Sequence, residues 1–158
     1  MTNYLKLLLV IACVISLPIN ANDSDEFKPV LKVFTGISLA DHDLIKSAVT
    51  DDFLLLEVGE VWDTDILLSF IEPSASTRKN HFSIISTHDL GEAVLINYWN
   101  KAHITTDGKE TIRAWLESVV SVKTKDGWKL LQMHSTRLKP EAIPKDVVFE
   151  LLEYTEKN

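Results

Sequence analysis

Residues 92–138 read EAVLINYWNKAHITTDGKETIRAWLESVVSVKTKDGWKLLQMHSTRL, and this stretch decides the fold. It contains three runs rich in Val, Ile, Trp and Thr, at 92–105, 110–123 and 128–138, and a similar run precedes it at 78–87. Asp-Gly pairs separate the last three runs, and Asp-Gly between such runs is a strong hairpin signal. The sequence therefore predicts a four-stranded antiparallel meander whose long strands twist and curl the sheet.

Three helices are predicted ahead of the meander. Val30, Val33, Phe34 and Ile37 have the spacing of one helix face. A second helix is expected from Ser38, because residues 38–41 resemble a capping box; its apolar face would comprise Leu39, Leu44, Ile45, Ala48 and Val49. Asp63 is expected to cap a third helix with Ile66, Leu67, Phe70 and Ile71 buried.

A short strand at 53–58, closed by Gly59, is expected between the second and third helices. The predicted class is therefore α+β, with a strongly curved antiparallel β-sheet wrapped around the N-terminal helices as a cone open at one end. Residues 27–139 show no internal boundary, and residues 140–158 are expected to form a C-terminal tail with a short amphipathic helix.

Residues 1–21 are typical of a secretory signal peptide. One basic residue, Lys6, precedes an apolar run that ends at Pro18, and Ala21 is a suitable cleavage position. We expect a periplasmic or secreted protein without stable membrane insertion after cleavage, because the apolar run is too short to cross a bilayer. Alternatives are an uncleaved anchor and a lipoprotein lipidated at Cys13.

Cleavage at Ala21 would change the composition of the protein. Removing 21 residues from 158 leaves 137, and loss of Lys6 takes the formal charge from −7 to −8. A disordered leader is expected at 22–26. Without Cys13 the mature chain has no thiol, which excludes thiolate chemistry and disulfides. The acidic balance argues against nucleic acid as a partner, since phosphate binding needs clustered Lys and Arg.

Several local patterns resemble one protein family. The order of helices and curled meander, the run Asp51-Asp52-Phe53, Gly59, and above all residues 127–135 resemble the nuclear transport factor 2-like (NTF2-like) superfamily, in particular its SnoaL-like bacterial branch. The resemblance covers residues 27–138. The resemblance implies the NTF2-like cone. The superfamily includes isomerases, cyclases, dehydratases and members without demonstrated catalysis.

Glu57 and His134 are the candidate catalytic residues. The resemblance places Glu57 near the carboxylate of ketosteroid-isomerase-like relatives, although the acid-Pro pair of that group is missing. An apolar pocket would raise the pKa of such a carboxylate and suit it as a base. His134 lies on the strand with the family pattern and could act as acid or base. A carboxylate at the sheet rim and a half-buried structural histidine are the alternatives.

Aromatic and amide side chains on the meander are the candidate ligand-binding residues. Such residues suit an apolar pocket with a few polar groups, or alternatively a packed core and a dimer interface. The candidates are Trp62, Asn97, Tyr98, Trp99, Asn100, Trp115, Glu117 and Gln132. The five histidines show no paired spacing with acids, so no metal site is predicted, and the absence of a phosphate-binding loop predicts no cofactor.

These observations leave three functions open. The first is an exported module that binds a small hydrophobic molecule in the cone. The second is a cofactor-independent isomerase, cyclase or hydratase acting on a small carbonyl compound by acid-base catalysis. The third is a structural dimerisation module, because both faces of each strand mix apolar and polar residues and a homodimer through the sheet is expected.

Overall fold

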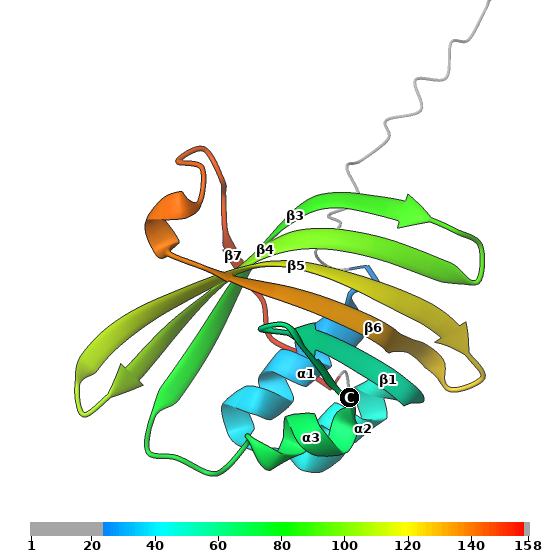
Figure 1. Cartoon of the computed structure of the whole chain (residues 1–158), viewed down its shortest axis with the longest axis horizontal. Coiled ribbons are helices and arrows are strands. Elements are labelled where there is room, and N and C mark those ends of the chain that lie inside the picture. The colour runs from blue at the N-terminus through cyan, green and yellow to red at the C-terminus, as the bar shows by residue number, and fades with distance from the viewer. Residues whose placement is uncertain (1–23, 157–158) are drawn as a thin grey trace, which may run out of the picture.

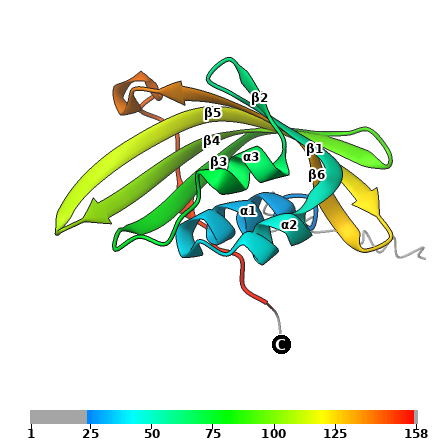
Figure 2. The same cartoon turned by 60° about the horizontal axis from the view of Figure 1, so that its bottom comes forward.

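A curved sheet of seven strands holds three helices on its concave side (Figures 1 and 2). The structure is a computed structural model and describes residues 24–156. The helices are α1 (Lys28–Leu39), α2 (His42–Ala48) and α3 (Thr64–Ser69). The strands are β1 (Val49–Glu57), β2 (Glu60–Trp62), β3 (Thr77–Asp89), β4 (Ala93–Thr106), β5 (Lys109–Thr124), β6 (Gly127–Leu138) and β7 (Glu150–Leu151).

The predicted α+β cone is confirmed. Strands β3 to β6 form the antiparallel meander, and the sheet order is β2-β1-β6-β5-β4-β3-β7. The sheet is mixed rather than wholly antiparallel, because β1 pairs in parallel with β6. Parallel neighbours need a long connection, which here is the whole meander, so neighbouring residues alone could not reveal this pairing.

The boundary between α1 and α2 differs from the prediction. Helix α1 continues through Leu39 and ends at Ala40, whose φ of 53° is left-handed. Helix α2 starts at His42 rather than Ser38, and its N-cap is Asp41, whose carboxylate accepts a hydrogen bond of 2.9 Å from the backbone N–H of Leu44. The predicted apolar position Leu39 is consequently 70% exposed.

Close packing of α1 on α2 depends on Gly36. A Cβ at this position would lie 2.5 Å from Cγ1 of Ile45 and 2.9 Å from the backbone oxygen of Asp41. Only glycine allows so close an approach without displacement of α2.

Helix α3 begins as predicted, with Asp63 accepting a 2.8 Å hydrogen bond from the backbone N–H of Ile66. Its buried face is only partly as predicted. Leu67 and Ile71 are buried, but Ile66 is 40% and Phe70 65% exposed. The helix is only six residues long and lies at the open side of the cone, so fewer of its side chains meet the core.

Both ends of the domain also differ from expectation. The described part of the leader, residues 24–26, forms a turn that packs on β5, where the Ser121 hydroxyl donates to the Glu26 carbonyl at 2.8 Å. The tail forms the 3-10 helix η2 (Pro140–Ala142) and strand β7 in place of the expected amphipathic helix. The predicted signal peptide, with Cys13, lies outside the described residues. Within residues 24–156 no helix is long and apolar enough to cross a membrane.

The core lies between the helices and the concave face of the sheet. Phe27, at the start of α1, contacts Tyr98 and Phe82 edge-on, with ring centroids 5.2 and 5.6 Å apart. All three rings are completely buried. This cluster fills one end of the cone, and the open space lies toward the other end.

Candidate functional site

A cavity of about 360 Å³ opens between α1, α3 and the concave face of the sheet. We call it the cone pocket. Apolar side chains from these elements form most of its wall: Val33, Phe34, Ile37, Leu55, Val58, Trp62, Leu67, Phe70, Ile71, Trp115 and Met133. Its polar lining consists of Glu57, Arg78, Arg113, Glu117, Ser135 and Arg137. A mainly apolar cavity of this size with a few polar groups is typical of small-molecule sites.

Glu117 is the buried carboxylate of the cone pocket. It points inward from β5 and is 4% exposed. The Ser135 hydroxyl donates to its Oε1 at 2.9 Å, and Nδ2 of Asn100 donates to its Oε2 at 3.1 Å. Burial raises the pKa of Glu117 to about 7, although these hydrogen bonds and the positive charge of Arg78 act in the opposite direction. The carboxyl group can therefore exchange a proton near neutral pH.

Tyr98 lies beside this carboxylate but is part of the core. Its hydroxyl makes no well-formed hydrogen bond to any described residue. It is nevertheless near enough to Glu117 for each group to influence the pKa of the other. Burial, together with the adjacent Glu117 charge, raises the pKa of Tyr98.

A series of hydrogen bonds joins Glu117 to Arg78 on β3. Asn100 accepts at Oδ1 from Nδ2 of Asn80 at 2.8 Å, and Asn80 accepts at Oδ1 from Nε of Arg78 at 3.0 Å. Asn80 and Asn100 are both buried. We call the series Arg78–Asn80–Asn100–Glu117 the polar relay. It satisfies amide groups that would otherwise destabilise the core.

The guanidinium of Arg78 lies among aromatic rings. It is 5.3 Å from the ring centroid of Trp115 and 5.8 Å from that of Phe34. The pKa of Arg78 is lowered to about 10, mainly by burial; the charge of Arg113 adds to this effect, whereas Glu117 and Glu57 oppose it. The group stays positively charged at neutral pH but is poorly solvated.

The mouth of the cone pocket carries a different set of groups. Trp62 stacks on Phe70 with ring centroids 4.7 Å apart, and its indole N–H donates to Glu60 at 2.8 Å. Glu57 is half-buried here, while Arg113 and Arg137 are exposed.

The structure brings some of the predicted site residues together. Glu57, Trp62, Trp115 and Glu117 line the cone pocket, and Asn100 bonds to Glu117 behind its wall. Whether each has a functional role stays a prediction.

Apart from Tyr98, which lies in the core, the other predicted residues lie on the opposite, convex face of the sheet. His134 and Gln132 are exposed there, and Trp99 and Asn97 alternate with the inward-facing residues of β4. The Asn97 amide donates to the Ser86 hydroxyl at 3.0 Å instead of facing a cavity. Glu57 and His134 therefore do not face one another across a pocket.

A β-bulge explains the position of His134. The pairing of β5 with β6 shifts between Val120–Gln132 and Ser121–Leu130, so Leu131 is an extra residue. Leu130 and Met133 are consequently both buried although three residues apart. Strict alternation groups Leu130 with Gln132 and His134 on one face, and it fails at this bulge.

Sequence reasoning did not single out Arg78, Asn80, Ser135 or Arg137 as site residues. Alternation from Trp115 and Glu117 could have included Arg113. On β6, strict alternation assigns Ser135 and Arg137 to the face opposite Leu130, whereas the bulge at Leu131 puts them on the same face. One further signal was available: the chain has only three arginines. In residues 24–156 no group of three or more His, Cys, Asp or Glu could hold a metal ion.

Solved structures with a similar fold are of several kinds. A ketosteroid isomerase-like protein from Erwinia carotovora atroseptica is 17% identical with a TM-score of 0.59, and the match covers 77% of this chain and 99% of that one. An NTF2-like protein of unknown function in nutrient uptake from Rhodospirillum rubrum is 15% identical with a TM-score of 0.60, over 74% of this chain and 100% of that one. The association domain of C. elegans CaMKII is 16% identical with a TM-score of 0.57, over 66% and 86%.

No protein-family model matches the sequence, and a comparison with curated proteins found no match. At these identities the similarity shows the fold alone.

Proposed function

We propose, from the premise that this chain has the NTF2-like fold, that it binds a small, largely apolar molecule in the cone pocket. The observation that carries the proposal is a cavity of about 360 Å³ with an apolar wall and one buried carboxylate, Glu117. A ligand of matching size would remove this apolar surface from water, and Glu117 and Ser135 would orient its polar group.

The test uses ligand-induced thermal stabilisation of residues 22–158. We expect compounds from a set of small hydrophobic carbonyls, steroids and polyketide fragments to raise the melting temperature, because a ligand that binds only the native state stabilises it. Trp115→Leu should weaken binding at least about fivefold, since one well-placed aromatic contact is worth about 1 kcal/mol.

Trp99→Leu is the matched control, because Trp99 lies on the neighbouring strand but on the other face of the sheet. Its affinity should equal that of the parent. Equal losses in both variants would contradict binding in the cone pocket, and so would the lack of stabilisation by any small molecule, neutral or acidic.

A second candidate function is acid-base catalysis on a small carbonyl compound. Glu117 favours it, because a buried carboxyl group with a pKa of about 7 faces the pocket. If the protein is such an isomerase, cyclase or hydratase, ketones that bind should incorporate deuterium from D₂O beside the carbonyl with the parent and not with Glu117→Gln. Binding of ketones without incorporation of deuterium would contradict acid-base catalysis and support ligand binding alone.

Two further proposals concern the protein as a whole. We propose export with cleavage after Ala21, which the mass of the mature N-terminal peptide tests; a peptide that starts at Cys13 would indicate the lipoprotein instead. We also propose a homodimer through the convex face of the sheet, and the similarity to association domains supports an oligomer.

A further inference from the structure

All three arginines of the chain line the cone pocket. They come from three strands, Arg78 from β3, Arg113 from β5 and Arg137 from β6. The chain also has 13 lysines, and none of those that the structure describes lines this pocket. In a protein with a formal net charge of −7, the guanidinium groups are thus concentrated at one cavity.

Arginine and lysine differ in what they recognise. A guanidinium group presents a planar fork of N–H donors that matches the two oxygens of a carboxylate, and it is more weakly hydrated than an ammonium group. Lysine serves equally well where only solubility is needed. The segregation of the two residue types therefore points to anion recognition in the pocket.

The arginines have no direct ion-pair partner in the part of the chain that the structure describes, and Glu117 and Glu57 act on Arg78 only through space. Arg78 uses its Nε for the Asn80 amide and lies against the rings of Trp115 and Phe34. A poorly solvated cation without a paired anion gains most from a ligand that supplies the negative charge.

The remaining charges of the pocket do not balance the arginines. Glu57 and Glu117 are its only carboxylates among the described residues, against three guanidinium groups. Glu117 is bound to Ser135 and Asn100 and is partly protonated near neutral pH, which leaves the pocket positive.

We propose that the ligand of the cone pocket is an organic carboxylate: an apolar body lies against Phe34, Leu67 and Met133, and the carboxylate is bound by Arg78, Arg113 and Arg137. This inference rests on the proposed function, that the pocket binds a small molecule. The inference differs from the proposed function in one respect: the expected ligand is anionic instead of neutral. The apolar lining favours an organic anion over inorganic phosphate or sulfate, which have no apolar body to bury.

The test compares acids with their neutral amides of the same shape. Hexanoate and hexanamide, benzoate and benzamide, and phenylacetate and phenylacetamide are titrated calorimetrically into residues 22–158 at pH 7, with inorganic phosphate and sulfate in parallel. We expect at least one acid to bind ten or more times more tightly than its amide, and the inorganic anions to bind more weakly than that acid.

Variants at the mouth locate the binding site without risk to the core. Arg113→Gln and Arg137→Gln change exposed side chains and should each weaken the acid at least threefold while leaving the amide unchanged. Lys79→Gln is the matched control, because it removes one positive charge next to Arg78 in sequence but outside the pocket. Arg78→Lys, checked for folding by circular dichroism, should weaken the acid despite keeping the charge.

The outcomes separate this inference from the proposed function. If amides or neutral ketones bind as tightly as the acids, the anionic ligand is wrong and the small-molecule pocket stands. Equal losses in Lys79→Gln, or phosphate binding as tight as the best acid, would also overturn it. If no probe binds, charged or neutral, the proposed function fails as well.

Discussion

At the scale of single residues, Glu117 is the group whose environment departs most from that of a surface carboxylate. Its pKa of about 7 exceeds the usual 4.5 because it is buried. The folded state therefore holds a proton that the unfolded chain releases between pH 4.5 and 7. Protonation of Glu117 thus stabilises the fold at low pH, and this contribution is lost as the pH rises to 7 and above.

Glu117→Gln should remove this pH dependence. A shift of this size corresponds to roughly 3 kcal/mol. The hydroxyl oxygen of the protonated parent can still accept a hydrogen bond, whereas the amide nitrogen of glutamine cannot, so the variant should lose about 1 kcal/mol at pH 5. At pH 8 it should be more stable than the parent by about 2 kcal/mol. Urea unfolding at pH 5, 6, 7 and 8 measures both effects.

Glu141→Gln, an exposed carboxylate on η2, is the control and should follow the parent at every pH. A constant difference between Glu117→Gln and the parent from pH 5 to 8 would contradict a buried, proton-binding Glu117.

The sequence allowed prediction of only some single residues of the site. The alternation of β5 put Trp115 and Glu117 on one face, and the structure has them there. Arg78 could not be placed, because it comes from an edge of the meander and its partners Asn80 and Asn100 become neighbours only through strand pairing. Such contacts depend on register, which the local pattern does not contain.

At the scale of elements, the meander and the helix that Asp63 caps followed from local patterns. Hairpin turns and N-caps are short-range, so they can be recognised within a few residues. The bulge at Leu131 and the parallel β1–β6 pair could not be recognised, because each depends on a strand distant in sequence. The helix predicted in the tail was wrong for the same reason. Its apolar spacing fits a helix, but the segment pairs as β7 with the free edge of β3, which is distant in sequence.

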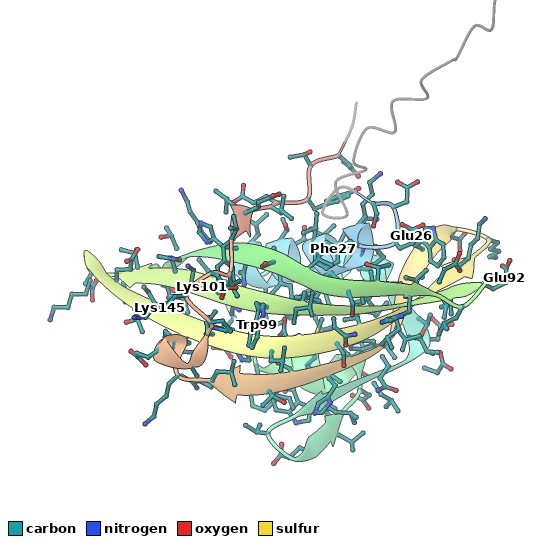
Figure 3. All side chains as sticks on the ribbon, turned by 90° about the horizontal axis from the view of Figure 1, so that it is seen from above. Glu26, Phe27, Glu92, Trp99, Lys101 and Lys145 are labelled. Carbon is teal, nitrogen blue, oxygen red and sulfur yellow. The ribbon has the colours of Figure 1, made fainter. Side chains whose placement is uncertain are left out.

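The tail wraps around an edge of the sheet. Lys101 is labelled on β4 in Figure 3. Its Nζ lies 4.2 Å from the ring centroid of Phe149 in the tail. Strand β7 then pairs with β3, and the backbone N–H of Tyr154 donates to the Thr35 hydroxyl on α1 at 3.1 Å. The tail therefore joins the meander to the first helix.

Removal of residues 140–158 should destabilise the domain by about 2 to 4 kcal/mol. The tail packs Leu152 and Tyr154 against the core, and burial of each side chain contributes on the order of 1 to 2 kcal/mol. The unfolding free energy in urea measures the loss. Removal of residues 157–158 alone is the control and should have no effect. Equal stability of the two truncated proteins would show that the tail does not support the fold.

At the scale of the whole molecule, the convex face of the sheet carries apolar side chains that no described part of the chain covers. Ile112 and Leu116, which alternate with the inward-facing Trp115 and Glu117 on β5, are 39% and 38% exposed. A stable interface needs about 1,000 Å² or more of buried surface, which a sheet of this size can supply. The proposed homodimer would cover these side chains.

Leu116→Glu should convert the proposed dimer to a monomer, because a charge buried between two apolar faces is costly. Light scattering on residues 22–158 should give twice the chain mass for the parent and the single chain mass for the variant. Val61→Glu is the control, since Val61 is 61% exposed on β2, away from β5 in the sheet. A monomeric parent would contradict the homodimer.

The polar relay has a direction. Each donor in it points from Arg78 toward Glu117, so neither Asn80 nor Asn100 can rotate its amide without placing two donors or two acceptors face to face. The three bond dipoles therefore add head to tail instead of cancelling. A ligand anion that draws the Arg78 guanidinium toward itself would weaken the first bond and, through the amides, make Glu117 hold its proton more tightly. In thermodynamic terms, anion uptake and proton uptake would be linked, and the pocket would bind the two together as a neutral pair.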